Sequence, residues 1–263
     1  MTNCGAERPK IVCCNRACRL DQAGCPRGAL IETVVPTKSE APPFAPIAAP
    51  WHTAVMMLVI GTIAFRGWMR ADAMRPAVNL DRISLYTRTI LSEWMQLGLA
   101  LGGIWLHGSS PLSALGERWR SARQFFKDIG LGLLFLVASI TVTSVLGGQQ
   151  RTTDSATLFL LPQTNSERAW WIVVALSAGI CEEAIFRGYL QRQFMAMTRS
   201  VPGGILLSAV AFGAGHAYQG ASRAAVIVVL GIMGGILAYW RRSVRPGMIG
   251  HALQDLLGGF LRH

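Results

Sequence analysis

The chain has 263 residues, of which 51% are hydrophobic and 15% are charged, and its mean hydropathy is +0.36. Soluble domains carry about 25% charged residues, so this composition excludes an ordinary soluble globular domain. The formal net charge is +11 at pH 7. Because the basic residues cluster in the connectors between apolar blocks, the charge indicates membrane topology, and we expect no nucleic-acid partner.

The apolar residues form long blocks, and each block approaches the ~20 residues with which a helix crosses a bilayer. We therefore predict an all-α fold, a polytopic transmembrane helical bundle with about seven spans, six to eight being compatible with the pattern. The predicted spans are 47–65, 90–106, 129–146, 169–189, 202–218, 224–240 and 248–261. We expect a multi-pass protein of a cell membrane, in first place a bacterial inner membrane, with the lipid bilayer as a partner. The charges of the connectors conflict and leave the membrane orientation open.

The chain divides into three predicted regions. Residues 1–46 contain five of the six cysteines and end in a proline-rich stretch, so we expect a disordered tail. A zinc knuckle in this tail is the weaker alternative, because the cysteine spacing matches no standard CxxC pair. Residues 47–165 hold the N-terminal transmembrane helices, and residues 166–263 form the predicted catalytic domain.

Four features outside the main motifs also carry predictions. His52 and Glu93 lie near predicted span ends, where we expect them to reach the membrane interface. The stretch 112–126 alternates apolar residues with arginines and resembles an interfacial amphipathic helix. Gly231 and Gly235 are four residues apart and predict a close contact with another helix.

The titratable residues that stand out lie in three predicted spans near the C-terminus. The first span carries Glu182, Glu183 and Arg187, the second carries Phe212 and His216, and the third carries His251 and Asp255. A charged group inside a bilayer costs roughly 2.5–3.5 kcal/mol or more. Three spans that each carry such a group therefore indicate a functional site rather than three unrelated packing residues.

Their spacing predicts how these groups pair. Glu183 and Arg187 lie one helical turn apart and can form an ion pair, for which we expect a supporting role. Glu182 then points about 100° away from Glu183 and can face another partner. If the fourth and fifth spans form a hairpin that turns near residue 199, Glu182 and His216 lie at equal depth.

The seventh predicted span, 248–261, which carries His251, is harder to place. Folding back across the sixth span leaves His251 about ten residues, or ~15 Å, away from the depth of His216. Within this seventh span, Asp255 lies one turn from His251 and can hold its imidazole in one tautomer. Phe212 likewise lies one turn from His216 and can pack beside its ring.

A glutamate and two histidines can activate water for hydrolysis. The carboxylate acts as a general base, one imidazole shares the proton, and the other donates to the oxyanion of a tetrahedral intermediate. Glu182, His216 and His251 are also donors that zinc accepts. These residues alone leave metal-free and zinc-assisted hydrolysis both open.

The three motifs are Glu-Glu-x-x-x-Arg at 182–187, Phe-x-x-x-His at 212–216 and His-x-x-x-Asp at 251–255. In this order, on successive spans, they resemble the CPBP intramembrane proteases, the family of CAAX-processing enzymes and bacteriocin-immunity proteins. The resemblance covers roughly residues 165–263. It implies a helical bundle with a polar cavity open to water. The implied activity is a metal-free, glutamate-type endopeptidase without a cofactor that cleaves a membrane-associated protein or peptide.

The resemblance also implies a role for each residue. Glu182 and His216 would activate the attacking water, and His251 and Asp255 would stabilise the oxyanion, while Glu183 and Arg187 would support the site together with Phe212. The prenyl-protein enzymes have Asn where this chain has Asp255, and an ionised Asp accepts but does not donate a hydrogen bond. We therefore expect Asp255 either to be protonated or to orient His251.

Two other functions stay open. The first is a catalytically inactive membrane protein with an immunity or interaction role. The second is a proton-coupled transporter, since titratable residues within spans also serve proton relays.

Overall fold

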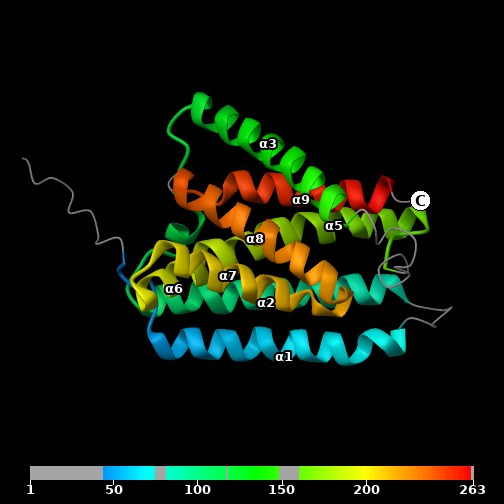
Figure 1. Ribbon diagram of the computed structural model, residues 1–263, viewed down its shortest axis with the longest axis horizontal. Coiled ribbons are helices and arrows are strands. Elements are labelled where there is room, and N and C mark those ends of the chain that lie inside the picture. The colour runs from blue at the N-terminus through cyan, green and yellow to red at the C-terminus, as the bar shows by residue number, and fades with distance from the viewer. Residues whose placement is uncertain (1–43, 75–80, 117, 148–159, 262–263) are drawn as a thin grey trace, which may run out of the picture. The chain divides into compact units, whose positions relative to one another are not determined.

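The computed structural model describes residues 44–74, 81–116, 118–147 and 160–261. The predicted tail, residues 1–46, lies outside the described residues except for its last three positions. The described elements are helices (Figure 1). They are α1 (Pro50–Met74), α2 (Arg82–Leu106), η1 (Pro111–Leu115), α3 (Ala122–Gly147), α5 (Asn165–Glu182), η2 (Glu183–Leu190), α6 (Gln191–Thr198), α7 (Val201–Gly215), η3 (Ala217–Gln219), α8 (Ala221–Arg241) and α9 (Arg245–Leu261).

The predicted helical bundle is confirmed, and each of the seven predicted apolar blocks lies largely within a helical stretch. Four described stretches are long and apolar enough to cross a membrane, and α7 is a shorter apolar helix. The four stretches are Pro50–Arg70, Ala122–Leu146, Asn165–Thr198 and Ala221–Arg241. Among the described helices, α2 and α9 do not meet this criterion; α2 carries Glu93 and α9 has 17 residues.

Large apolar side chains face outward along the helices. Leu58 and Phe65 on α1 are 70% and 59% exposed, and Leu134 and Val137 on α3 are 64% and 60% exposed. Soluble proteins rarely expose apolar residues so extensively, whereas the hydrocarbon of a bilayer covers such a surface. The surface therefore agrees with the composition in indicating a membrane protein.

Local sequence signals explain where the central helix begins and turns. Thr164 and Glu167 form a capping box at the start of α5, in which each side chain accepts a hydrogen bond from the other residue's backbone N–H. At the end of α6, Arg199 adopts a left-handed conformation with φ 50°. Ser200 then caps α7, and Pro202 occupies its first turn. This short turn makes α6 and α7 antiparallel neighbours.

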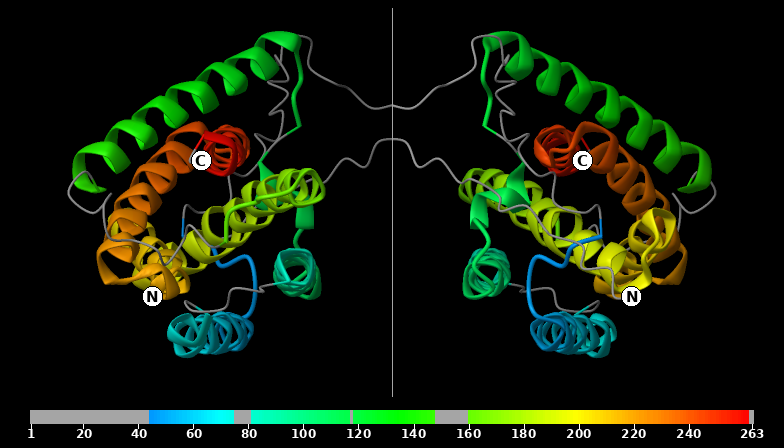
Figure 2. Two further views of the ribbon diagram at one scale, coloured as in Figure 1. Left: turned by 90° about the vertical axis from the view of Figure 1, so that its right-hand side faces the viewer. Right: turned by 90° about the vertical axis from the view of Figure 1, so that its left-hand side faces the viewer.

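The helices that carry the site lie side by side in the compact unit Ala41–His263. In Figure 2, α9 lies between α3 and α5, with α3 on the outside. The helix α7 contacts α6 and α8. Helices of both predicted regions, 47–165 and 166–263, pack within this unit, and the boundary at 165 stays a prediction.

The predicted close helix contact at the small residues of α8 is confirmed. A Cβ atom on Gly231 would lie 3.0 Å from Cα of Ala209, and one on Gly235 would lie 2.7 Å from Oε1 of Gln191. Gln191 in turn donates from Nε2 to the carbonyl of Gly235 at 3.0 Å. The two glycines thus let α8 approach α7 and α6 closely.

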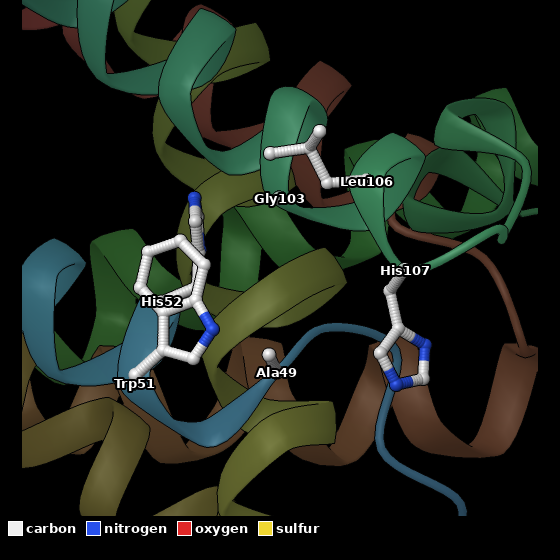
Figure 3. A pocket seen from close by; sticks show the side chains of 6 residues that line it. All are labelled: Ala49, Trp51, His52, Gly103, Leu106 and His107. Atoms are coloured by element: carbon white, nitrogen blue, oxygen red, sulfur yellow. The ribbon is translucent and has the colours of Figure 1, made fainter.

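His52 lies near the start of α1, and its side chain is buried within the protein, while its position at the membrane interface stays a prediction. Its ring is 3% exposed, its Nδ1 lies 2.6 Å from Oη of Tyr189, and it fills the space above Gly103. A cavity of about 130 Å³ opens beside it, lined by Ala49, Trp51, His52, Gly103, Leu106 and His107 (Figure 3). The hydrogen bond to Tyr189 explains the burial, because it pairs the imidazole within the core.

The predicted amphipathic helix at 112–126 is wrong. The 3-10 helix η1 ends at Leu115, the described residues 118–120 are not helical, and Phe125 and Phe126 belong to α3. Gly116 interrupts the helical pattern, because its φ of 88° lies in the left-handed region.

Candidate active site

Glu182 and Glu183 lie where the α-helical hydrogen bonding of α5 gives way to the π-helical segment η2. Every residue of η2 is buried, and π-helical turns inside α-helices occur frequently at functional sites. The side chain of Glu183 is 2% exposed and that of Glu182 is 18% exposed. The two adjacent carboxylates therefore differ in access to solvent.

Glu183 forms an ion pair with Arg187. Oε1 of Glu183 lies 3.0 Å from Nη1 of Arg187, and both side chains are buried, which confirms the predicted ion pair. The guanidinium lies 4.3 Å from the centre of the Phe212 ring. A Cβ atom on Gly234 of α8 would lie 3.3 Å from Nε of Arg187, so the small residue leaves room for this side chain.

His216 ends α7 with one ring nitrogen already engaged. Its Nδ1 lies 2.9 Å from the carbonyl oxygen of Phe212, an acceptor that selects the tautomer with the proton on Nδ1. Nε2 is then a proton acceptor, and it lies 4.0 Å from Oε2 of Glu182. This distance confirms that the hairpin brings Glu182 and His216 together. The Phe212 ring packs edge-on against His216, with ring centres 4.8 Å apart, as predicted.

His251 lies among three carboxylates. Its Nδ1 is 3.3 Å from Oε1 of Glu183, and its Nε2 is 3.6 Å from Oε2 of Glu182 and 3.6 Å from Oδ2 of Asp255. The ring thus connects the buried ion pair on one side with the more exposed carboxylates on the other. Both histidines meet Glu182, as the three motifs predict.

The predicted depth mismatch of His251 is removed by the way α9 packs. The helix α9 contacts α3 and α5 more extensively than it contacts α8, so the position of His251 is set by α5 rather than by folding back along α8. Gly179 on α5 and Gly247 on α9 allow this approach. A Cβ atom on Gly179 would lie 2.8 Å from the Met248 carbonyl oxygen, and one on Gly247 would lie 2.6 Å from Oε2 of Glu183.

Asp255 occupies the outer edge of the group. Its side chain is 36% exposed, and its separation of 3.6 Å from Nε2 of His251 exceeds hydrogen-bond length. The indole Nε1 of Trp171 donates to the backbone carbonyl of Asp255 at 2.9 Å and joins α5 to α9 there. Glu183, rather than Asp255, therefore accepts the hydrogen bond that orients His251.

Glu93 is the residue that the sequence reasoning missed. It is 7% exposed and interacts electrostatically with Glu182, Asp255 and His251, and its Oε2 has no hydrogen-bond partner among the described residues. Its predicted place at the interface is wrong because α2 begins at Arg82, earlier than its apolar block, so that Glu93 lies near the middle of the helix. The sequence signal that could have identified Glu93 as a site residue is its position as a single glutamate in an apolar stretch.

The arrangement offers a carboxylate and an imidazole nitrogen that can share one water, with a second imidazole across from them. Glu182, His216 and His251 are also the donors predicted for zinc, and their facing atoms are 3.6–4.0 Å apart. Within the described part of the chain, no group of three or more His, Cys, Asp or Glu side chains has an arrangement that could hold a metal ion.

Comparison with known protein families identifies one family that matches part of the chain. Residues 164–257 match the family described as "Type II CAAX prenyl endopeptidase Rce1-like". This segment contains all seven residues of the three motifs, and the predicted resemblance is confirmed. No curated protein and no solved structure matches the chain.

Proposed function

The chain carries an Rce1-like domain of the CPBP family at residues 164–257, and from this premise we propose that it is an intramembrane endopeptidase. The family supports CAAX-protease-like activity in general. Our proposal goes further in four points. The protein crosses a cell membrane several times, in first place a bacterial inner membrane; it hydrolyses a peptide bond; its substrate is a membrane-associated protein or peptide; and Glu182 and His216 activate the water.

The first step is the attack of water on the peptide carbonyl. A water between Oε2 of Glu182 and Nε2 of His216 gives up a proton to this pair as its oxygen bonds to the carbonyl carbon. The Phe212 carbonyl supports this step, because it accepts the Nδ1 proton of His216 at 2.9 Å and leaves Nε2 as the acceptor. The carbonyl oxygen becomes an oxyanion.

The second step stabilises and then collapses the tetrahedral intermediate. Nδ1–H of His251 donates to Glu183, and a proton on Nε2 donates to the oxyanion. As the C–N bond breaks, the proton taken from water passes to the leaving amine, which restores Glu182 and His216. Asp255, at the exposed edge, adds negative charge beside Nε2 and favours the protonated ring in this role.

The convergence of Oε2 of Glu182 with Nε2 of both histidines, at 4.0 and 3.6 Å, carries the proposal. Its test uses purified full-length protein in detergent with quenched peptides that end in a farnesylated CAAX sequence, with their unmodified counterparts, and with a general peptide library. We expect wild-type cleavage of at least one set, and Glu182→Gln and His216→Ala to lower the rate by about 10²–10⁴-fold.

His107→Ala is the matched control, since His107 is an exposed histidine at the end of α2, away from these groups. It should cleave at the wild-type rate. Full activity of both Glu182→Gln and His216→Ala would refute the mechanism. Glu182→Gln that still supports an immunity or interaction phenotype in cells would favour the inactive scaffold instead.

We propose the metal-free form of the reaction, which the family resemblance favours. In the alternative, zinc would be held by Glu182, His216 and His251 and would polarise the water and the peptide carbonyl. Elemental analysis of active protein after washing with a chelator decides between them. Stoichiometric zinc that activity requires would overturn the metal-free form.

Glu93 gives specific support to the proton-transporter alternative, because it adds a buried carboxylate from the N-terminal half to those of the C-terminal half. Proteoliposomes loaded with a pH-sensitive dye distinguish the two functions. Peptide cleavage without proton flux supports the endopeptidase, and proton flux that Glu93→Gln abolishes supports the transporter.

A further inference from the structure

Tyr218 lies beside the candidate active site and is not assigned a role in the proposed reaction. It belongs to the 3-10 helix η3, in the short connection between α7 and α8, two residues after His216. Its ring and the imidazole of His216 are stacked, with ring centres 6.1 Å apart and planes inclined by 27°. Rings at such separations attract one another, so this contact can fix the orientation of the imidazole.

The contact depends on the turn that follows α7, because residues two apart do not face each other on an α-helix. The helix α7 ends before His216, whose φ of −102° and ψ of 10° depart from α-helical values. The His216 carbonyl then accepts a hydrogen bond from the backbone N–H of Gln219 at 2.9 Å, and the Ala217 carbonyl accepts one from Gly220 at 3.0 Å. This hydrogen-bonded turn brings Tyr218 beside the ring of His216.

Three contacts together define the position of the His216 ring. Its Nδ1 lies 2.9 Å from the carbonyl oxygen of Phe212, which fixes one point of the ring. The Phe212 ring meets it at an interplanar angle of 66°, whereas the Tyr218 ring lies at 27°. The two aromatic rings therefore restrict rotation of the imidazole about the hydrogen bond. In the resulting orientation, Nε2 lies 4.0 Å from Oε2 of Glu182.

Tyr218 is itself held in place, as a side chain that orients another must be. Its Oη accepts a hydrogen bond from Nε2 of Gln219 at 3.0 Å. The helix α1 packs against η3, and a Cβ atom on Gly67 of α1 would lie 3.8 Å from Cβ of Tyr218. Since α1 precedes the matched segment 164–257, the N-terminal region also supports the ring that contacts His216.

The phenol of Tyr218 also lies near the carboxylates of the site. It is half-buried and interacts electrostatically with Glu182, Asp255 and Glu93. A phenol is neutral near pH 7, so it covers the imidazole without adding another negative charge to this group.

From these observations we propose that Tyr218 is a positioning residue of the endopeptidase. Its ring holds the imidazole of His216 so that Nε2 stays directed at the water shared with Glu182, while its hydroxyl serves only to fix the ring through Gln219. The inference rests on the proposed function, in which Nε2 takes part in removing the proton from water. A misplacement of about 1 Å in such a group can cost roughly 100-fold in rate.

The test measures kcat and KM of the purified full-length protein with a peptide that the wild type cleaves. Tyr218→Leu removes the ring and keeps an apolar side chain, and Tyr218→Phe keeps the ring and removes only the hydroxyl. Tyr218→Met is tested in parallel, since its flexible side chain fills irregular space and the result then does not depend on the folding of one variant. Tyr239→Leu is the matched control, because Tyr239 is 48% exposed and lies at the end of α8 that is far from η3.

We expect Tyr218→Leu and Tyr218→Met to lower kcat by about 10–100-fold and to leave KM within about twofold of wild type. Tyr218→Phe and Tyr239→Leu should stay within about threefold of the wild-type kcat, because both keep the ring that contacts His216. Adding Tyr218→Leu to His216→Ala should cause no further loss, because a residue that acts through His216 has no effect in its absence.

Three results would overturn this inference alone. The first is a wild-type kcat in Tyr218→Leu and Tyr218→Met while His216→Ala is slow. The second is an equal loss in Tyr218→Phe, since the hydroxyl and not the ring would then be required. The third is a further loss in the double variant, which would show that Tyr218 acts independently of His216. Full activity of His216→Ala would instead remove the proposed reaction, and this inference with it.

Discussion

Four carboxylates approach one another around His251, namely Glu93, Glu182, Glu183 and Asp255. One of them, Glu183, is paired with Arg187 at 3.0 Å. The other three carboxylates interact with His251, and Asp255 is also exposed to solvent. Like charges in a buried site oppose folding unless they are paired or protonated, so this cluster is expected to lower the stability of the fold.

Glu93 lets this expectation be tested with a single isosteric change. Glu93→Gln removes one acidic group while keeping the shape, so we expect the unfolding temperature to rise by about 2–4 °C, as for roughly 1 kcal/mol. Peptide cleavage should stay within about threefold of wild type, because Glu93 is not assigned to the reacting atoms. Thermal unfolding in detergent and the cleavage assay measure the two effects.

Glu182→Gln is the matched comparison for this variant. It makes the same chemical change at the carboxylate that faces both histidines. Its activity should be lost. If Glu93→Gln lost activity to the same extent, Glu93 would be part of the proton path, and the division of roles among the carboxylates would have to be redrawn.

At the scale of single residues, the sequence was sufficient to predict that Glu182, His216 and His251 lie close together, because intramembrane charge is too costly to occur three times without a use. It could not choose the partner of each atom. The acceptor for Nδ1 of His251 is Glu183 and not Asp255, although Asp255 lies one helical turn away. That choice depends on how α9 packs against α5, which spacing along one helix does not contain.

At the scale of elements, the contact between α9 and η2 sets the geometry of the site. Gly247 faces Glu183, and a Cβ atom there would lie 2.6 Å from its Oε2. The alanine methyl would displace a carboxylate that both Arg187 and His251 require. The absence of a side chain at position 247 is therefore part of the site.

We predict that Gly247→Ala lowers the cleavage rate by roughly 10–100-fold, because displacing Glu183 misplaces His251. Overpacking should also lower the stability by about 1–3 kcal/mol. Gly258→Ala on the same helix is the control, since nothing lies within 4 Å of its Cβ position. It should cleave normally and be as stable as wild type or slightly more stable. Equal behaviour of the two variants would show that the contact at Gly247 has no effect on the site.

The helices themselves were largely predictable, because blocks of apolar residues reveal where a helix can lie in a membrane. The blocks fell short of the true ends wherever a helix begins with polar residues. The start of α2 at Arg82 and of α3 at Ala122 are examples, and the first of these concealed the central position of Glu93. The π-helical segment η2 could not be predicted, since its hydrogen bonding depends on the packing of fully buried residues against α1, α2 and α7.

At the scale of the whole molecule, successive helices run in opposite directions, so their ends separate into two groups (Figure 1). The end of α2, the start of α3, the end of α6 and the turn between α8 and α9 lie on one side. The starts of α5 and α8 lie on the other. Excess arginine marks the cytoplasmic side of a membrane, but both sides carry arginines. Arg118, Arg120, Arg241 and Arg242 lie on the first side, and Arg66, Arg70, Arg82 and Arg223 lie on the other, so the charges leave the orientation open.

Labelling of single cysteines tests this topology and, with it, the proposal that the chain crosses the membrane several times. In a background without the native cysteines, Ser110→Cys and Met197→Cys report one side, and Gln163→Cys and Ser222→Cys report the other. All four positions are exposed. A maleimide that cannot cross membranes, added to intact cells, should label one of these two pairs and not the other, and all four should react once the cells are opened. The pair that is labelled in intact cells gives the orientation of the chain. Labelling of all four from outside would show that the helices do not cross, because antiparallel spanning helices cannot present both groups of ends to one face.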